Sequence, residues 1–283
     1  MKSNGKTALV TGASSGIGEE IARVLLSDGY RVYAAARRID RMKALEAAGA
    51  KLLPLDVTND ASMQAAMARI SQDGATVDVL INNAGYGAFG SVEDMPLDEA
   101  RRQFEVNVFG LARLTQLVLP AMRKNRAGKI VNITSIAGQI SEPFGAWYHA
   151  TKFAVEGFSD CLRMEVAPFG IDVIIVQPGA IKTEWNSIAR TGLLQVSGGG
   201  AYGRAAIKHA RFLEGADTSP NTSGPEAVAQ TVHRALKATR PRTRYATGRG
   251  AGTILAVRRW LPDRAFDRLA MMVSQRSLFS KLV

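Results

Sequence analysis

Short apolar segments alternate with longer segments of helical periodicity along most of the chain. The apolar segments lie at residues 7–10, 31–35, 51–55, 77–81, 129–134, 171–177 and 243–246. The helical patterns lie at residues 18–27, 41–48, 62–71, 97–124, 148–167 and 225–238. Strands joined by helices pair in parallel, and strands covered on both faces are apolar without alternation, as several of these are. The predicted fold class is therefore α/β: a doubly wound (Rossmann), mostly parallel seven-stranded sheet with helices on both faces.

The length of 283 residues suits one α/β domain with a full core. We expect a single catalytic domain over residues 1–250 and a basic, amphipathic, helical extension over residues 251–283. Residues 184–224 break the alternation, and glycines cluster at 198–200 within them. Because long irregular segments in compact domains are often functional, we interpret residues 184–224 as a mobile substrate lid.

The location of the protein is predicted from what precedes the first strand and from cysteine content. The first predicted strand begins near residue 7, which leaves no room for a signal peptide, and no apolar run reaches about 18 residues. Cys161 is the only cysteine, which suits a reducing cytoplasm, and we expect its side chain to be packed. His149, His209 and His233 lack the spacing of metal ligands, so no metal site is predicted.

The net charge of +11 is concentrated at the C-terminal end. Residues 240–283 hold nine Arg and one Lys against Asp263 and Asp267, a net charge of +8. No zinc-ligand set or helix-turn-helix pattern accompanies them, so nucleic-acid binding is not expected. The segment could cover the substrate cleft, pack on a second subunit, dock on the protein's own surface, or lie on an anionic membrane with Trp260 and Phe266 inward. We predict peripheral membrane contact, because basic and bulky apolar residues combine in interfacial helices.

A glycine-rich turn from Thr11 to Gly18 follows the first strand and opens a helix. Gly12, Gly16 and Gly18 allow the backbone to approach a pyrophosphate, whose charge suits the N-terminus of a helix. The turn therefore predicts dinucleotide binding. The second strand ends in Arg37 and Arg38, with no acidic residue before Asp40. A guanidinium pairs well with a 2′-phosphate, so the predicted cofactor is NADP(H).

Six motifs in order resemble those of the short-chain dehydrogenase/reductases, in their simple single-domain branch. They are the Thr11–Gly18 turn, Asn-Asn-Ala-Gly at 82–85, Asn107, Ser135, Tyr-His-Ala-Thr-Lys at 148–152, and Pro-Gly-Ala-Ile-Lys-Thr at 178–183. Within that family the chain is similar to bacterial 17β-hydroxysteroid and retinol dehydrogenase-like oxidoreductases. The resemblance is strong from about residue 6 to residue 183.

The resemblance implies catalytic roles for Ser135, Tyr148, Lys152 and Asn107: Tyr148 as general acid/base, Ser135 on the substrate oxygen, Lys152 on the nicotinamide ribose, and Asn107 on a water of the proton relay. Tyr148 and Lys152 are four residues apart and share a helix face. A phenol has a pKa of about 10, which a lysine ammonium and an oxidised nicotinamide would lower.

The implied cofactor-binding residues follow the same motifs. Asp56 either holds the adenine amino group or caps the next turn. The backbone of residues 83–85 is expected to line the cofactor, while their side chains brace the sheet. The full set is Gly12, Ser14, Ser15, Gly16, Ile17, Gly18, Arg37, Arg38, Asp56, Val57, Asn83, Ala84, Gly85, Tyr148, Lys152, Pro178, Gly179, Ile181 and Thr183.

The predicted function is hydride transfer between NADP(H) and a small hydrophobic carbonyl or alcohol. Apolar and aromatic residues of the lid favour such a substrate: Trp185, Ile188, Leu193, Leu194, Tyr202 and Phe212. Two alternatives are an NADP(H)-binding regulator without turnover, and an epimerase or dehydratase that uses the same Tyr and Lys. The family resemblance also implies a homodimer or homotetramer.

Overall fold

The computed structural model describes residues 5–220 and 222–275. Seven strands form one sheet in which every neighbouring pair is parallel, in the order β3-β2-β1-β4-β5-β6-β7. The strands are β1 (Thr7–Thr11), β2 (Arg31–Ala36), β3 (Lys51–Pro54), β4 (Val79–Asn82), β5 (Gly128–Ile133), β6 (Ile171–Pro178) and β7 (Arg244–Thr247). The predicted fold class is confirmed, and all seven strands lie where the apolar segments indicated.

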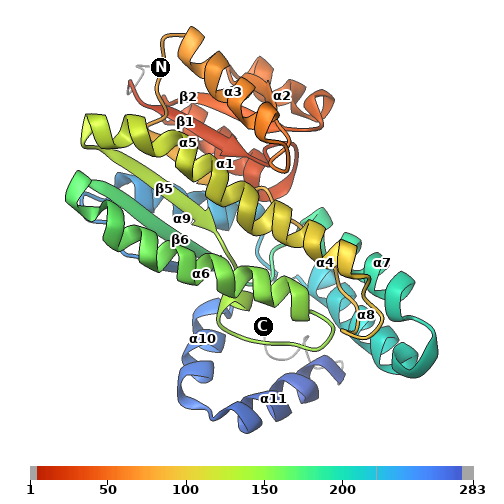
Figure 1. Ribbon diagram of the computed structural model, residues 1–283. Coiled ribbons are helices and arrows are strands. Elements are labelled where there is room, and N and C mark those ends of the chain that lie inside the picture. The colour runs from red at the N-terminus through yellow and green to blue at the C-terminus, as the bar shows by residue number, and fades with distance from the viewer. Residues whose placement is uncertain (1–4, 221, 276–283) are drawn as a thin grey trace.

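Helices cover both faces of this sheet. Figure 1 shows α3, α5 and α6 in front of the sheet and α1 and α9 behind it. The helices are α1 (Gly16–Ser27), α2 (Lys43–Ala47), α3 (Asp60–Gln72), α5 (Gly110–Asn125), α6 (Ala146–Val166) and α9 (Pro225–Lys237). Side chains of β1 alternate between the two layers: Ala8 and Val10 pack toward α1 and α9, and Leu9 packs toward α3 and α5. The central strands are therefore buried on both faces.

The strand order reverses at β1, whose neighbours are β2 and β4. At such a switch point the connections leave the sheet in opposite directions and open a crevice beyond the carboxyl ends of the strands. Four of the six predicted motifs lie at or just beyond those ends. The glycine turn follows β1, Asn83 follows β4, Ser135 follows β5, and Gly179 follows β6. The topology thus gathers residues distant in sequence at one edge.

The helix predicted at residues 97–124 contains a π-helical segment. α4 (Leu97–Phe104) continues through Glu105–Phe109, which is π-helical, into α5. A single π turn inside an α-helix changes which residues face inward and is frequent at functional sites. Here it contains Asn107, one of the predicted catalytic residues, whose side chain is buried.

Residues 184–224 are mostly helical, so the expectation of an irregular insertion is wrong. α7 (Glu184–Ser197) and α8 (Gly203–Thr218) lie against each other. Their apolar residues recur at helical spacing and bury Ala189, Leu193, Ala206 and Ala210 in one cluster. The apolar burial favours helices on both sides of the glycines at 198–200. These glycines interrupt the helical structure only between α7 and α8. A role as a lid stays a prediction.

The C-terminal extension is helical where the structure describes it, as α10 (Ala251–Trp260) and α11 (Asp263–Gln275); residues 276–283 lie outside the described part. α11 packs on α8. Phe266 is buried beneath the Arg258 guanidinium, 5.3 Å from its ring centre, so the expectation that Phe266 faces a membrane is wrong. Trp260 is 82% exposed.

Two further observations concern the exterior. Cys161 is exposed on α6, so the expectation of a packed side chain is wrong; it lies on the solvent side of that helix. Among the described residues, none of the helices is both long and apolar enough to cross a membrane.

Two helical glycines give a matched test of packing between α5 and the β3–α3 connection. A Cβ on Gly110 would lie 2.5 Å from the Val57 carbonyl oxygen, whereas a Cβ on Gly157 of α6 would meet nothing within 4 Å. Gly157→Ala should stabilise the protein by about 0.5–1 kcal/mol, the usual gain in a helix interior. Gly110→Ala should destabilise it by about 1–3 kcal/mol because the backbone must move. Urea unfolding measures both; equal effects at the two positions would contradict the packing described here.

Candidate active site

The glycine turn after β1 is held in a conformation that suits glycine. Gly12 and Gly16 have φ of +66° and +56°. A Cβ on Gly18 would overlap the Gly12 carbonyl oxygen, so the turn and the first turn of α1 are in direct contact. Ser15 precedes α1 without a side-chain capping bond in the described chain, which leaves the N–H groups of the first turn for an anion. Ile17 is partly buried and packs at the edge of the core. The turn fits a pyrophosphate.

Hydrogen bonds tie this turn to the end of β4. The Asn83 side chain donates from Nδ2 to the carbonyl oxygens of Thr11 (3.0 Å) and Gly12 (3.4 Å). The Thr11 hydroxyl accepts from the backbone N–H groups of Asn83 and Ala84, both at 3.0 Å. The Asn83 side chain therefore braces the turn, and a contact of the backbone of residues 83–85 with the cofactor stays a prediction. Thr11 was not predicted to take part, although a threonine at a strand end is a common hydrogen-bonding residue.

The end of β2 carries Arg37 and Arg38, both exposed. Arg38 Nη2 lies 3.4 Å from the hydroxyl oxygens of both Ser14 and Ser15 on the glycine turn. This contact brings a guanidinium beside the place where the turn fits a pyrophosphate. Three predicted cofactor residues from the segments after β1 and β2 are thus brought together.

Asp56 caps its own turn in this structure. Its Oδ1 accepts from the N–H (2.9 Å) and the hydroxyl (2.8 Å) of Thr58. Burial would raise the pKa of Asp56, but the hydrogen bonds from Thr58 and the charge of Arg37 hold that pKa below its usual value. Asp56 therefore remains an anion near Arg37. A contact of Asp56 with adenine stays a prediction, as does the cofactor role of neighbouring Val57.

The predicted catalytic residues meet beyond β5. Ser135 accepts from the Ala137 N–H (3.1 Å) and donates to the Pro178 carbonyl (3.3 Å), which fixes its hydroxyl next to β6. Tyr148 and Lys152 lie on one face of α6, and Lys152 Nζ is 5.8 Å from the centre of the Tyr148 ring. Lys152 Nζ also donates to the Ile133 carbonyl at 3.0 Å. The three side chains share one buried site.

Burial governs the protonation of this site. It raises the pKa of Tyr148 well above that of a free phenol, Glu142 adds to the increase, and a hydrogen bond with Ser135 opposes it. Burial lowers the pKa of Lys152 to about 8, against the opposing charge of Glu156. The protein's own groups therefore keep Tyr148 protonated, the form needed to donate a proton. The lowering expected from two nearby positive charges stays a prediction.

Asn107 is engaged in a bracing role. Its Nδ2 donates to the Tyr86 carbonyl (2.9 Å) and to the Thr151 hydroxyl (3.1 Å), and its Oδ1 accepts from the Tyr86 N–H (3.0 Å). Thr151 in turn donates to the Tyr148 carbonyl at 2.7 Å. Asn107 thus joins the loop after Gly85 to the start of α6. Thr151, which no sequence pattern singled out, is part of the same connection.

The segment that follows β6 lies against the glycine turn that follows β1. Gly179 donates from its N–H to the Thr247 carbonyl (2.9 Å), and Ile181 forms a bridge with Ser223. Thr183 caps α7 by accepting from the Trp185 N–H (3.3 Å). A Cβ on Gly16 would be 3.2 Å from Thr183 Cγ2, so the predicted nicotinamide segment lies against the predicted phosphate turn.

Aromatic side chains surround Tyr148. The ring centre of Trp185 is 4.9 Å from that of Tyr148, and Phe89 lies 5.9 Å from it. Of the six predicted lid residues, Trp185, Leu193 and Phe212 belong to this cluster. The other three do not: Ile188 and Leu194 are exposed, and Tyr202 donates its hydroxyl to Glu93. Ile188 and Leu194 lie on the exposed side of α7, and Tyr202 lies in the short 3₁₀ segment Gly200–Tyr202 before α8.

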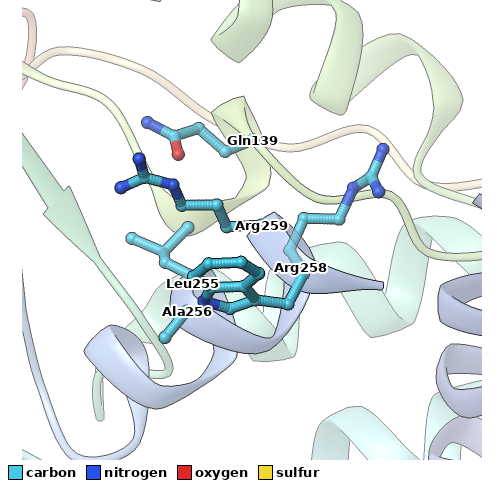
Figure 2. Close-up of a pocket in the computed structure, with 6 residues that line it drawn as sticks. Gln139, Leu255, Ala256, Arg258 and Arg259 are labelled. Carbon is cyan, nitrogen blue, oxygen red and sulfur yellow. The ribbon is translucent and has the colours of Figure 1, made fainter. Parts of the chain in front are cut away.

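A hollow of about 630 Å³ lies between the loop after Ser135 and α10 (Figure 2). It is lined by Gln139, Leu255, Ala256, Arg258, Arg259 and Trp260. Tyr148 does not line it. The C-terminal extension therefore forms one wall of an opening next to the loop that follows Ser135.

A parallel sheet with a glycine turn and a Ser-Tyr-Lys site at its carboxyl edge defines a nicotinamide-dependent oxidoreductase. Residues 6–192 match the family model for short chain dehydrogenases. An uncharacterized oxidoreductase of Bacillus subtilis is 33% identical over 287 residues, 98% of this chain and 100% of that protein. A 3-ketodihydrosphingosine reductase of Bacteroides thetaiotaomicron is 44% identical over 176 residues, 62% of this chain and 64% of that protein. The chain belongs to the short-chain dehydrogenase/reductase family.

Solved structures agree with this assignment. A short-chain dehydrogenase from Streptomyces avermitilis superposes with a TM-score of 0.78 and 36% identity, covering 90% of this chain and 92% of that one. An actinorhodin polyketide ketoreductase variant with NADPH has a TM-score of 0.76 and 31% identity, covering 89% and 99%. A Burkholderia phymatum member in complex with NAD has a TM-score of 0.76 and 29% identity, covering 92% and 93%. The second of these structures holds NADPH and the third holds NAD, and both support a nicotinamide cofactor.

Because the pKa of Lys152 is lowered in the folded protein, the free energy of unfolding should depend on pH. Lys152 has a pKa of about 8 in the folded protein and about 10.4 when unfolded, so the unfolded state binds more protons between those values. Stability contributed through Lys152 therefore rises as pH rises from about 8 to 10.4. Lys152→Met removes this titration, so its free energy of unfolding relative to wild type should fall across that interval, by up to about 1.4 kcal/mol per pH unit.

Urea unfolding at several pH values measures this difference. Lys208→Met on the exposed side of α8 is the control for losing a lysine. A difference between Lys152→Met and wild type that stays constant from pH 7 to 10 would contradict a lowered pKa for Lys152.

Proposed function

We propose that this protein is an NADP(H)-dependent oxidoreductase that transfers a hydride between nicotinamide and a hydrophobic carbonyl or alcohol, with Tyr148 as the general acid/base. The observation that carries the proposal is the buried Tyr148 phenol beside Lys152, at the carboxyl edge of the sheet that also holds Ser135 and the glycine turn.

When bound, the nicotinamide would supply or accept the hydride. In the reducing direction Ser135 holds the carbonyl oxygen of the substrate, and Tyr148 donates its proton to that oxygen as negative charge develops there. Lys152 lies beside the ring, where its ammonium stabilises the phenolate that remains. The proton moves within a site from which burial excludes water, so the charge of Lys152 acts with little screening.

The two alternatives are less well supported. A regulator that binds NADP(H) without turnover has no use for a tyrosine and lysine held together at 5.8 Å in a buried site. An epimerase or dehydratase would use the same pair but return the cofactor to its starting state. Net consumption of NADPH with a ketone separates the proposal from both.

Preference for NADP(H) is supported by Arg38. Its guanidinium contacts Ser14 and Ser15 of the glycine turn, and Arg37 beside it is exposed. A 2′-phosphate on the adenosine ribose would meet two cations there rather than a carboxylate.

The hydrophobic substrate is supported by the ring cluster of Phe89, Trp185 and Phe212 around Tyr148, and by the name of the 3-ketodihydrosphingosine reductase relative, which is a ketone reductase. An assembly of two or four copies stays a prediction. Peripheral membrane contact also stays a prediction, and it now rests on exposed Trp260, Arg259 and Arg264. Binding to anionic but not to neutral vesicles at low salt would support that contact.

Tyr148→Phe keeps the ring packed against Trp185 and removes the proton donor. We expect kcat for ketone reduction to fall by about 10²-fold or more, the scale of general acid catalysis, while NADPH binding and thermal stability are retained. Tyr202→Phe, which removes a hydroxyl bound to Glu93 outside the cluster, is the control and should leave kcat unchanged. A Tyr148→Phe protein with normal kcat would exclude Tyr148 as the acid.

Arg38→Gln removes the cation from the glycine turn. We expect the Kd for NADPH to rise about ten- to a hundredfold, the scale of one hydrogen bond to a charged group, with little change for NADH. Arg31→Gln, at the other end of β2, is the control. Fluorescence titration with both cofactors measures the change; an equal effect on NADH and NADPH would mean that Arg38 does not read the 2′-phosphate.

A further inference from the structure

Glu156 is buried on α6, one helical turn after Lys152, and takes no part in the proposed chemistry. Its Oε1 accepts from the Thr134 hydroxyl (2.7 Å) and from the side-chain amide of Gln177 (3.1 Å). Its Oε2 accepts from Nε of Arg244, on β7, at 2.9 Å. Three donors from three neighbouring strands therefore fix this carboxylate beside the active site.

Both donors to Oε1 lie next to the residues that fix the Ser135 hydroxyl. Thr134 directly precedes Ser135 at the end of β5, and Gln177 directly precedes Pro178 on β6. The Ser135 hydroxyl donates to the Pro178 carbonyl at 3.3 Å. The register of the two strands ends one residue earlier, before Thr134 and Gln177. The Glu156 carboxylate therefore joins the two strand ends at the point where the Ser135 hydroxyl is positioned.

The same carboxylate is, among the described residues, the charged group that acts on Lys152. Burial lowers the pKa of Lys152 to about 8, and the charge of Glu156 opposes that decrease. Side chains four residues apart on a helix are neighbours. Tyr148 lies one turn before Lys152, and Glu142 in the loop before α6 acts on Tyr148. Without Glu156, a smaller fraction of Lys152 would be an ammonium at neutral pH.

Arg244 reaches Glu156 from the edge strand of the sheet. Its guanidinium donates from Nε to Glu156 and from Nη2 to Asp160 Oδ2 at 2.6 Å, so it bridges two carboxylates one helical turn apart. The hydrogen bond and charge of Arg244 hold the pKa of Asp160 below its usual value, and Asp160 stays an anion that keeps the guanidinium in place. The cation of Arg244 offsets part of the Glu156 charge that Lys152 experiences.

We propose that Glu156 is a positioning residue of the active site, which fixes the Ser135 hydroxyl and stabilises the Lys152 ammonium. Arg244 moderates the second effect, because its cation offsets part of the Glu156 charge. Glu156 then acts on the reaction through the two residues that touch the substrate and the cofactor. This inference rests on the proposed function and names a residue on which that same site depends.

The pH profile of kcat/KM for ketone reduction tests the effect on Lys152, because two variants should shift it in opposite directions. In Glu156→Gln the alkaline fall in activity should move to lower pH by about one pH unit, the scale of one opposite charge removed. In Arg244→Met the Glu156 charge is no longer offset, and the fall should move to higher pH. Glu165→Gln, at an exposed position of α6, is the control and should leave the profile unchanged.

The effect on Ser135 is tested at the pH optimum. Glu156→Gln should lower kcat less in a Ser135→Ala background than in the wild type, because the hydroxyl that it positions is already absent. A loss of packing unrelated to Ser135 would lower kcat equally in both backgrounds.

Urea unfolding gives a readout that does not depend on turnover. The free energy of unfolding of Lys152→Met, relative to the same protein with Lys152, should begin to fall near pH 8 in the wild-type background. That fall should begin at lower pH in the Glu156→Gln background and at higher pH in the Arg244→Met background.

Alkaline falls in activity that coincide, or that move in the same direction in both variants, would overturn the inference. Equal losses of kcat with and without the Ser135 hydroxyl would also overturn it, as would a Lys152 titration that is the same in all three backgrounds. If the wild type reduces no ketone at all, the proposed function fails instead, and the unfolding titration still decides whether Glu156 acts on Lys152.

Discussion

The contact between the β1 turn and the end of β4 is the constraint on which the rest of the site depends. The Asn83 side chain and the Thr11 hydroxyl join the two strands on either side of the switch point through hydrogen bonds of 3.0–3.4 Å. Gly12 and Gly18 are required because any side chain there would collide with this connection. The glycine turn, Ser135 and Gly179 follow strands of this sheet, while Asn107, Tyr148 and Lys152 lie on helical segments next to it.

Burial gives the site its chemistry as well as its stability. The same removal from water raises the pKa of Tyr148 and lowers that of Lys152 to about 8. Both shifts disfavour charge: Tyr148 stays protonated, while Lys152, with a pKa of about 8, is still mostly an ammonium at neutral pH. Burying a lysine lowers the free energy of unfolding, and active sites commonly contain residues that destabilise the fold in this way.

The sequence predicted the strands and the motif residues because both depend on local patterns. Apolar runs predict buried strands, and a glycine turn between a strand and a helix is typical of a dinucleotide site. It did not predict the helices α7 and α8, since glycines at 198–200 suggested an irregular segment and the buried face became visible only in the fold. It also missed Thr151, whose bond to Asn107 joins elements distant in sequence. Phe266 and Cys161 were misplaced for a related reason: burial is set by which face of a helix meets the protein.

The central claim is that this crevice delivers a hydride from nicotinamide and a proton from the protein to one carbonyl group. The most direct measurement is the fate of deuterium when a hydrophobic ketone is reduced with NADPH doubly deuterated at C4 of the nicotinamide, in ordinary water. The account predicts an alcohol with one deuterium on the carbinol carbon and a hydroxyl hydrogen from solvent. An alcohol without deuterium, or no oxidation of NADPH with any ketone, would contradict it.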